Sequence, residues 1–180
     1  FDTAYELESE LEAANKEALL ELVRNVIPKN INCIYIRQSA PLGLGHAVLC
    51  ARPVIGNDPF AVLLADDFMD TDAGVKPVLA QMTDVFQREG HSILAVQDVP
   101  RAETRQYGIV SATAYQPQLE LVNAIVEKPQ PDVAPSTLAV VGRYVLSNKI
   151  FDYLETLGKG AGGEIQLTDG IAALMQAEKV

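Results

Sequence analysis

The chain has 180 residues, 48% of them hydrophobic, so it is long enough for one domain with its own core. A formal net charge of −10 argues against a surface for nucleic acid or anionic membrane, because such surfaces need clustered Lys and Arg. A nucleotide substrate is compatible with this charge, since Mg²⁺ or a helix N-terminus can neutralise phosphates locally. No apolar run approaches membrane-spanning length. Cys33 and Cys50 are too few and too isolated for a disulfide framework or a zinc site, which favours reduced thiols in the cytoplasm.

The first part of the chain predicts a helix, a strand, a loop and a second helix. Apolar residues recur at helical spacing over residues 4–26, and Pro28 ends that pattern. Residues 31–37 are rich in Ile, which is typical of a strand. A loop containing Pro and Gly follows over residues 38–45, and a short helix is expected over residues 46–51.

The rest of the chain is organised around residues 60–67. An unbroken aliphatic run there predicts a strand buried on both faces, in the middle of a parallel sheet, that ends in Asp66 and Asp67. A helix over residues 75–88 and an apolar strand over residues 92–99 follow. The alternation of helices and strands predicts an α/β fold, a three-layer α/β/α sandwich with a mixed, mostly parallel sheet.

The pattern changes after Pro100. Three strands follow without a helix between them, over residues 107–112, 119–127 and 138–146. Their succession predicts antiparallel or mixed pairing appended to the sheet. Two closing helices are expected over residues 149–157 and 167–176.

Residues at strand ends and in loops are the candidates for chemistry. Ligands bind at the carboxyl ends of strands in open α/β sheets, so Asp66 and Asp67 could hold a hard cation and a phosphate, or could merely start a solvated turn. The Gln38 amide could bind a planar base, because the glycines after it let the backbone approach closely. The alternative is that this loop serves only geometry.

A second strand end carries opposite charges. Adjacent strand residues point to opposite faces, so Glu127 and Lys128 are not expected to need each other as partners. A carboxylate at this position could accept from two sugar hydroxyls while the Lys meets a phosphate. Gly108, after Tyr107, either exposes its backbone to a ligand or forms a bulge. The sequence contains no Ser/His/Asp set, zinc spacing or Walker loop, and His46 is interpreted as a capping or packing residue.

Five stretches occur in a fixed order. They are Gln38-x-x-Pro41-x-Gly43-Leu44, Leu-Leu-Ala-Asp66-Asp67, Tyr107-Gly108, Val126-Glu127-Lys128-Pro129 and Val140-Val141-Gly142-Arg143-Tyr144. In this order they resemble the sugar-phosphate nucleotidylyltransferase family, and within it the bacterial uridylyltransferases that act on glucose 1-phosphate. Gly-Ala-Gly-Gly-Glu-Ile-Gln-Leu-Thr-Asp, near the C-terminus, is similar to the same subgroup. The resemblance runs along the whole chain.

The resemblance implies a transferase reaction of carbohydrate metabolism, in which UTP and glucose 1-phosphate give UDP-glucose and pyrophosphate. It implies that Gln38 and the Gly43 backbone contact the uracil. It also implies that Asp66 binds Mg²⁺, the expected cofactor, together with the nucleotide phosphates. We further expect a homo-oligomer with small-molecule substrates and with neither nucleic acid nor membrane as a partner.

The sugar half of the site is implied in the same way. The Gly108 backbone, Glu127 and Val140 would line the glucose site, and Lys128 would meet the sugar phosphate. Asp66 and Lys128 are therefore the residues expected to act in catalysis.

Two segments of the family pattern are absent from these residues. They are a Gly-rich N-terminal loop whose Arg and Lys hold the triphosphate, and a later Asp-Cys-Gly segment. We therefore expect a single domain over residues 1–180 that is an internal fragment, incomplete at both ends and lacking the first strand and the phosphate loop. Such a chain should by itself turn over essentially nothing.

Two alternatives stay open. A sister thymidylyltransferase is one, because Gln38 and Gly43 would suit thymine as well. The other is a non-catalytic regulatory or assembly domain of the same fold, which the residues upstream of Phe1 would distinguish from an enzyme.

Overall fold

A computed structural model describes residues 3–28 and 30–180. The chain divides into two compact units, a helical unit (Phe1–Arg37) and a sheet unit (Gln38–Val180). None of the helices in the described residues is long and apolar enough to cross a membrane.

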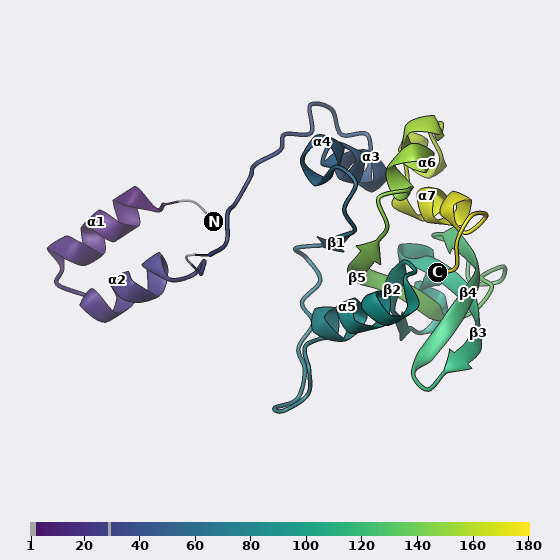
Figure 1. Ribbon diagram of the computed structural model, residues 1–180, viewed down its shortest axis with the longest axis horizontal. Helices are drawn as coiled ribbons and strands as arrows, with labels where there is room; N and C mark the ends of the chain where they lie inside the picture. Colours follow the sequence, from purple (N-terminus) through teal and green to yellow (C-terminus); the bar gives the residue numbers. More distant parts are fainter. Residues whose placement is uncertain (1–2, 29) are drawn as a thin grey trace. The chain divides into compact units, whose positions relative to one another are not determined.

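The helical unit contains two helices, α1 (Tyr5–Ala13) and α2 (Glu17–Arg24), which pack against each other (Figure 1). The prediction of one continuous helix over residues 4–26 is therefore wrong. Asn15 lies between the two helices with a φ of 52°, a left-handed conformation that Asn tolerates and that an α-helix cannot contain.

Residues 31–37 form no strand, contrary to the prediction. Ile34 and Tyr35 are both 66% exposed. High β propensity describes a side chain that fits a pleated, half-buried surface, so it creates no strand where no neighbouring strand pairs with the segment. None does within the part of the chain that the structure describes.

The sheet unit contains the other elements (Figure 1). Its helices are α3 (Leu44–Leu49), α4 (Arg52–Ile55), α5 (Val78–Glu89), α6 (Ile150–Thr156) and α7 (Leu167–Leu174). Its strands are β1 (Phe60–Leu63), β2 (Ile93–Asp98), β3 (Gly108–Gln116), β4 (Leu119–Glu127) and β5 (Leu138–Leu146). Short 3₁₀ turns lie at Arg101–Gln106 and Ala161–Gly163. Every element predicted from residue 46 onward is present, and β4 and β5 have the predicted bounds.

The strand pairs of the sheet are all antiparallel among the described residues, so the prediction of a mostly parallel sheet is wrong. The order is β1-β5-β3-β4, and β2 pairs with β5 as well. Tyr144 of β5 lies opposite Val62 of β1 and opposite Leu94 of β2, so β5 lies between these two strands. β1 and β2 run in the same direction, as the alternation with helices predicted, but a strand from much later in the chain separates them. The antiparallel pairing predicted for the later strands is confirmed by β3 with β4 and with β5.

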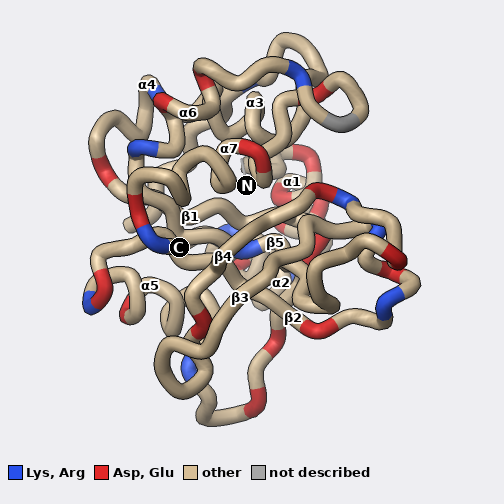
Figure 2. The backbone as a smooth tube through the Cα atoms, turned by 90° about the vertical axis from the view of Figure 1, so that its right-hand side faces the viewer, with Lys and Arg blue, Asp and Glu red and all other residues tan. Residues whose placement is uncertain are grey.

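Helices lie on two sides of the central strands. In Figures 1 and 2, α3, α6 and α7 lie above β1 and β5, and α5 lies below them. Val140, Tyr144 and Leu146, on one face of β5, belong to the core that α6 and α7 complete. α5 packs on β2 and β5 instead. This arrangement is the expected α/β layering.

β1 is only half buried, although its sequence predicted burial on both faces. Its residues alternate between intermediate and exposed, and Leu63 is 52% exposed. The reason is that α5 packs on β2 and β5, which leaves one face of β1 uncovered by the described residues. The strand also ends at Leu63, so the two aspartates lie in a turn beyond it rather than in its last positions.

Candidate functional site

A polar cleft of about 420 Å³ lies where several strands end. Its walls come from the turn after β1, the start of β3, the end of β4, the middle of β5 and the first residues of α7. Five of the predicted site residues line it, namely Asp66, Gly108, Glu127, Lys128 and Val140. Residues up to 74 positions apart in the sequence therefore meet in one place, as the resemblance implied.

The two aspartates of the turn have different surroundings. Asp67 is partly buried, and its Oδ2 accepts a hydrogen bond from the Gly142 N–H at 2.7 Å. A Cβ at Gly142 would lie 2.7 Å from the Asp67 Cβ, so this approach requires glycine. Asp66 is exposed, and no described residue hydrogen-bonds or ion-pairs with its carboxylate. Asp67 is thus occupied within the chain, and Asp66 is the carboxylate left for a ligand.

Arg143 holds the same turn in place, a role that sequence reasoning missed. Its guanidinium donates to the carbonyl oxygens of Leu64 at 3.0 Å, Gly142 at 2.8 Å and Asp67 at 2.5 Å. The bonds to Leu64 and Asp67 tie the turn after β1 to β5. The sequence contained Arg143 only as part of a motif, and nothing in the motif indicated which backbone it would meet.

Glu127 has a partner from the distant helix α7. Thr168 donates from Oγ1 to Oε2 of Glu127 at 2.9 Å, while Nζ of Lys128 lies 3.6 Å from the other carboxylate oxygen. Gly108 packs directly against this pair, since a Cβ there would lie 2.7 Å from Cγ2 of Thr168. The Glu127 side chain is 13% exposed and the Lys128 side chain 56%. The Glu127 carboxylate is therefore held in place, whereas the Lys128 ammonium faces solvent.

Lys128 also has an unusual backbone. Its φ is 45°, rare for a residue with a side chain, and its N–H donates to the Tyr107 carbonyl at 2.9 Å. Such backbone strain persists where the surrounding structure imposes it, which is common at functional sites.

Tyr144 forms part of the wall of the cleft and is only 5% exposed. Burial raises the pKa of its hydroxyl to about 12, and the negative charges of Glu127 and Asp67 act in the same direction. The hydroxyl therefore stays protonated at physiological pH, where it can donate a hydrogen bond but cannot act as a base.

The two residues predicted to contact a base lie beside the cleft rather than in its lining. Gln38 donates from Nε2 to the Gly43 carbonyl oxygen at 3.1 Å, and the same Nε2 lies 2.8 Å from Nδ1 of His46. Leu44, next to Gly43, does line the cleft. The loop that carries Gln38 is therefore adjacent to the residues predicted to bind phosphate and sugar.

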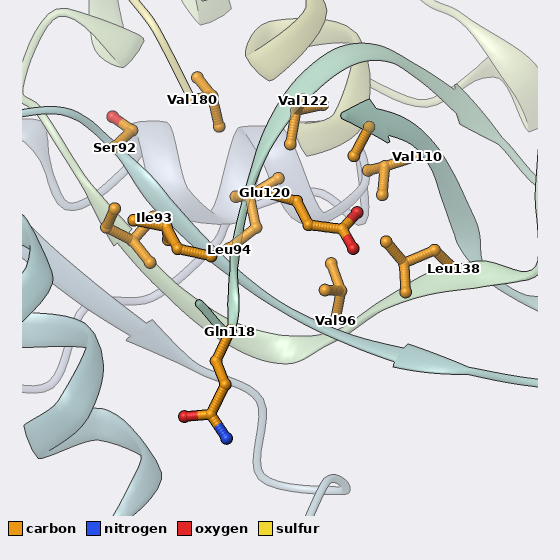
Figure 3. A pocket seen from close by; sticks show the side chains of 12 residues that line it. Ser92, Ile93, Leu94, Val96, Val110, Gln118, Glu120, Val122, Leu138 and Val180 are labelled. Atoms are coloured by element: carbon orange, nitrogen blue, oxygen red, sulfur yellow. The ribbon is translucent and has the colours of Figure 1, made fainter. Parts of the chain in front are cut away.

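A second cavity, of about 200 Å³, lies among β2, β3, β4, β5 and Val180 (Figure 3). Its walls are mainly aliphatic, and the carboxylate of Glu120 points toward Val110 and Leu138. Among the described residues that line it, Glu120 alone is charged. This apolar cavity offers no set of groups that would hold a phosphate or a sugar.

The described residues contain no group of three or more His, Cys, Asp or Glu side chains placed to hold a metal ion. A single carboxylate can still serve Mg²⁺, which is usually held by one or two carboxylates together with substrate phosphates and water. The unpartnered carboxylate of Asp66 fits that mode.

Comparison with known proteins decides the family. Residues 7–180 match the profile of the nucleotidyl transferase family. The chain belongs to the nucleotidyl transferase family. UTP–glucose-1-phosphate uridylyltransferase of Staphylococcus epidermidis (strain RP62A) is 46% identical over 180 residues, which are 100% of this chain and 61% of that protein. The family named by the sequence motifs is thereby confirmed.

Solved structures of nucleotidyl transferase relatives share the fold. A UDP-glucose pyrophosphorylase complexed with UDP-glucose is 38% identical with a TM-score of 0.85, over 93% of this chain and 62% of that one. A UTP-bound UGPase from Acinetobacter baumannii is 41% identical with a TM-score of 0.85, over 100% of this chain and 62% of that one. The chain thus spans about three fifths of the length of these relatives.

Proposed function

We propose that the protein carrying this chain transfers the uridylyl group of UTP to glucose 1-phosphate and releases pyrophosphate. The observation that supports this most directly is the meeting of Asp66, Glu127 and Lys128 in one cleft. They supply a free carboxylate, a fixed carboxylate and an exposed cation, from three different positions around one space. The names of the similar proteins favour UTP and glucose 1-phosphate as the substrates.

The proposed chemistry is an in-line displacement. An oxygen of the sugar phosphate attacks the α-phosphorus of UTP, a new P–O bond forms, and the bond to the pyrophosphate leaving group breaks. The attacking phosphate is already ionised at neutral pH, so no general base is needed, and catalysis rests on positioning and charge neutralisation. A reaction that needs no general base agrees with a cleft in which the Tyr144 hydroxyl stays protonated.

Six residues that line the cleft have a part in this proposal. Glu127, held by Thr168, accepts from hydroxyls of the glucose, and the exposed Lys128 ammonium binds the sugar phosphate. The Gly108 backbone and Val140 line the glucose site. Asp66 is proposed to hold Mg²⁺, which when bound would neutralise charge on the nucleotide phosphates.

The test is product formation by the full-length protein that contains these residues. UDP-glucose and pyrophosphate should form from UTP and glucose 1-phosphate in the presence of Mg²⁺, and kcat/KM for UTP should exceed that for dTTP. Faster turnover of dTTP would favour the thymidylyltransferase alternative. Failure to form either product, with the substrates still bound, would favour the non-catalytic alternative.

Two further expectations belong with the proposed function. A cytoplasmic location agrees with Cys33 and Cys50 as free thiols, and cell fractionation tests it. Assembly into a homo-oligomer stays a prediction, which light scattering of the full-length protein tests.

A further inference from the structure

One guanidinium holds both ends of the turn that carries Asp66. Nη1 of Arg143 donates to the Leu64 carbonyl oxygen at 3.0 Å, and Nη2 donates to the Asp67 carbonyl oxygen at 2.5 Å. The Asp67 N–H lies 3.4 Å from the same Leu64 oxygen, which closes a four-residue turn over residues 64–67. Asp66 is the third residue of this turn, so the backbone is held on both sides of it.

Strand β5 supports the turn at two further points. The Leu64 N–H donates to the Gly142 carbonyl at 2.9 Å, and the Gly142 N–H donates to Oδ2 of Asp67 at 2.7 Å. None of these bonds uses the carboxylate of Asp66, which has no partner among the described residues and lines the polar cleft. The turn is therefore fixed by its neighbours while one of its carboxylates stays free for a ligand.

Arg143 itself does not line the cleft. Its neighbours Gly142 and Tyr144 are both lining residues, and Arg143 is not. The side chain of Arg143 is half-buried and belongs to none of the ion pairs found among the described residues, so carbonyl oxygens are its acceptors. Any contact between Arg143 and a ligand of the cleft is therefore indirect, through the turn.

We propose that Arg143 is a positioning residue for the carboxylate of Asp66. By holding the carbonyl oxygens of Leu64 and Asp67 at once, it keeps Asp66 where it can bind Mg²⁺ together with the nucleotide phosphates. A guanidinium presents its N–H groups as a rigid planar fork, whereas a lysine ammonium is a compact point charge. The turn thus uses the shape of the side chain as well as its charge. The proposal rests on the proposed function, which assigns Asp66 to Mg²⁺.

The test uses the full-length protein and Arg143→Lys, which keeps the positive charge but loses the fork. Two measurements require no turnover. Hydrogen exchange of the ligand-free protein, followed by mass spectrometry, should be faster in peptides that cover residues 64–67, because the turn opens more often. The second measurement is Mn²⁺ binding in place of Mg²⁺, followed by electron paramagnetic resonance of free Mn²⁺ with saturating UTP and no glucose 1-phosphate. Its dissociation constant should rise about tenfold, the size of one hydrogen bond.

UTP is present in the binding measurement because Mg²⁺-type sites usually combine one or two carboxylates with substrate phosphates. In the rate assay, the Mg²⁺ concentration that gives half of the maximal rate should rise in the same proportion. The KM for glucose 1-phosphate should stay constant, which a general loss of structure would not allow.

Arg101 provides the matched control. It makes the same kind of bond elsewhere in the sheet unit, from Nη2 to the Ala134 carbonyl oxygen at 2.8 Å. Arg101→Lys should therefore change neither the exchange of residues 64–67 nor the affinity for Mn²⁺. If Arg143→Lys does not fold, Arg143→Gln, which keeps an amide donor, replaces it under the same criteria.

The outcomes separate the proposal from the proposed function. Wild-type hydrogen exchange in Arg143→Lys overturns the proposal, and so does a wild-type affinity for Mn²⁺. Absence of Mn²⁺ binding by the wild-type protein with UTP overturns it as well. The proposed function is contradicted only if the wild-type protein forms no UDP-glucose, an assay in which no Arg143 variant takes part.

Discussion

The polar cleft and the apolar cavity are two hollows of the same sheet, but different parts of the strands form them. The apolar cavity is lined mainly by residues within strands, such as Val96 of β2 and Val110 of β3, whose backbone groups are used in strand pairing. The polar cleft is lined in large part by residues at or just beyond the ends of β1, β3 and β4. Where pairing stops, backbone and side-chain polar groups are left over, and chemistry can use them.

The Gly142 N–H of β5 illustrates the difference between a paired strand and a strand end. β1 pairs with β5 only as far as Leu63 opposite Arg143. Next to that last pair, the Gly142 N–H meets the carboxylate of Asp67 instead of a carbonyl oxygen. Beyond the end of β1, the Gly142 N–H no longer pairs with a strand and instead holds the turn that carries Asp66 and Asp67. Substitutions in the two hollows test whether they differ in function.

The largest expected effect is in the turn after β1. Asp66→Asn should lower kcat/KM at least about 10²-fold at a fixed Mg²⁺ concentration, because loss of one well-placed group in such a site costs that much. Asp67→Asn should be milder, because the amide oxygen can still accept from the Gly142 N–H. Steady-state rates over a range of Mg²⁺ concentrations measure both. Equal losses in the two variants would show that the structure does not separate their roles.

The second effect is in the sugar half of the cleft. Glu127→Gln should raise the KM for glucose 1-phosphate about 10- to 100-fold, because hydrogen bonds to a charged group contribute roughly 1.5–3 kcal/mol. The KM for UTP should change much less. A rise confined to the KM for UTP would mean that Glu127 contacts the nucleotide and not the sugar, which would contradict this prediction.

Thr168→Val tests the support of Glu127 separately. It removes the hydrogen bond to Oε2 and should raise the KM for glucose 1-phosphate by less than Glu127→Gln does. Thr156→Val is the matched control, since Thr156 donates only to carbonyl oxygens of its own helix, α6, and should leave the KM unchanged.

A third effect belongs to the apolar cavity and concerns stability alone. Val110 is fully buried and lines that cavity, so Val110→Ala should lower the free energy of unfolding by about 1–3 kcal/mol. Activity well below the melting temperature should be unchanged, because the cavity offers no set of groups that would hold a phosphate or a sugar. Denaturant unfolding and initial rates on the same preparation measure both quantities. A changed KM for either substrate would contradict the distinction between the two hollows.

The smallest effect is expected for the one charged residue of the apolar cavity. Glu120 is exposed and forms none of the ion pairs found among the described residues. Glu120→Gln should therefore change the free energy of unfolding by less than about 0.5 kcal/mol and leave both KM values unchanged. A loss of turnover in this variant would mean that the second cavity also takes part in function.

The sequence by itself determined the elements whose signals are local. The bounds of β4 and β5 follow from mainly apolar segments between polar or Pro-rich turns, and the predicted bounds were correct. The ordered motifs placed Asp66, Gly108 and Glu127 at strand ends, and the structure brings them into one cleft. Family membership also followed from those motifs. Local periodicity and strand-end chemistry need no knowledge of which strand pairs with which.

Only the tertiary structure decided how these pieces meet. The insertion of β5 between β1 and β2 made the pairs antiparallel, and no local pattern specifies a partner so distant in the sequence. The same holds for Arg143 on the turn of Asp67, for Thr168 on Glu127 and for His46 on Gln38. A side chain's type sets which hydrogen bonds it can make, but its partner is whatever group the packing of distant segments brings within 3 Å or so of it. That packing gave Asp67 a hydrogen bond from the Gly142 N–H and gave the Asp66 carboxylate no partner among the described residues.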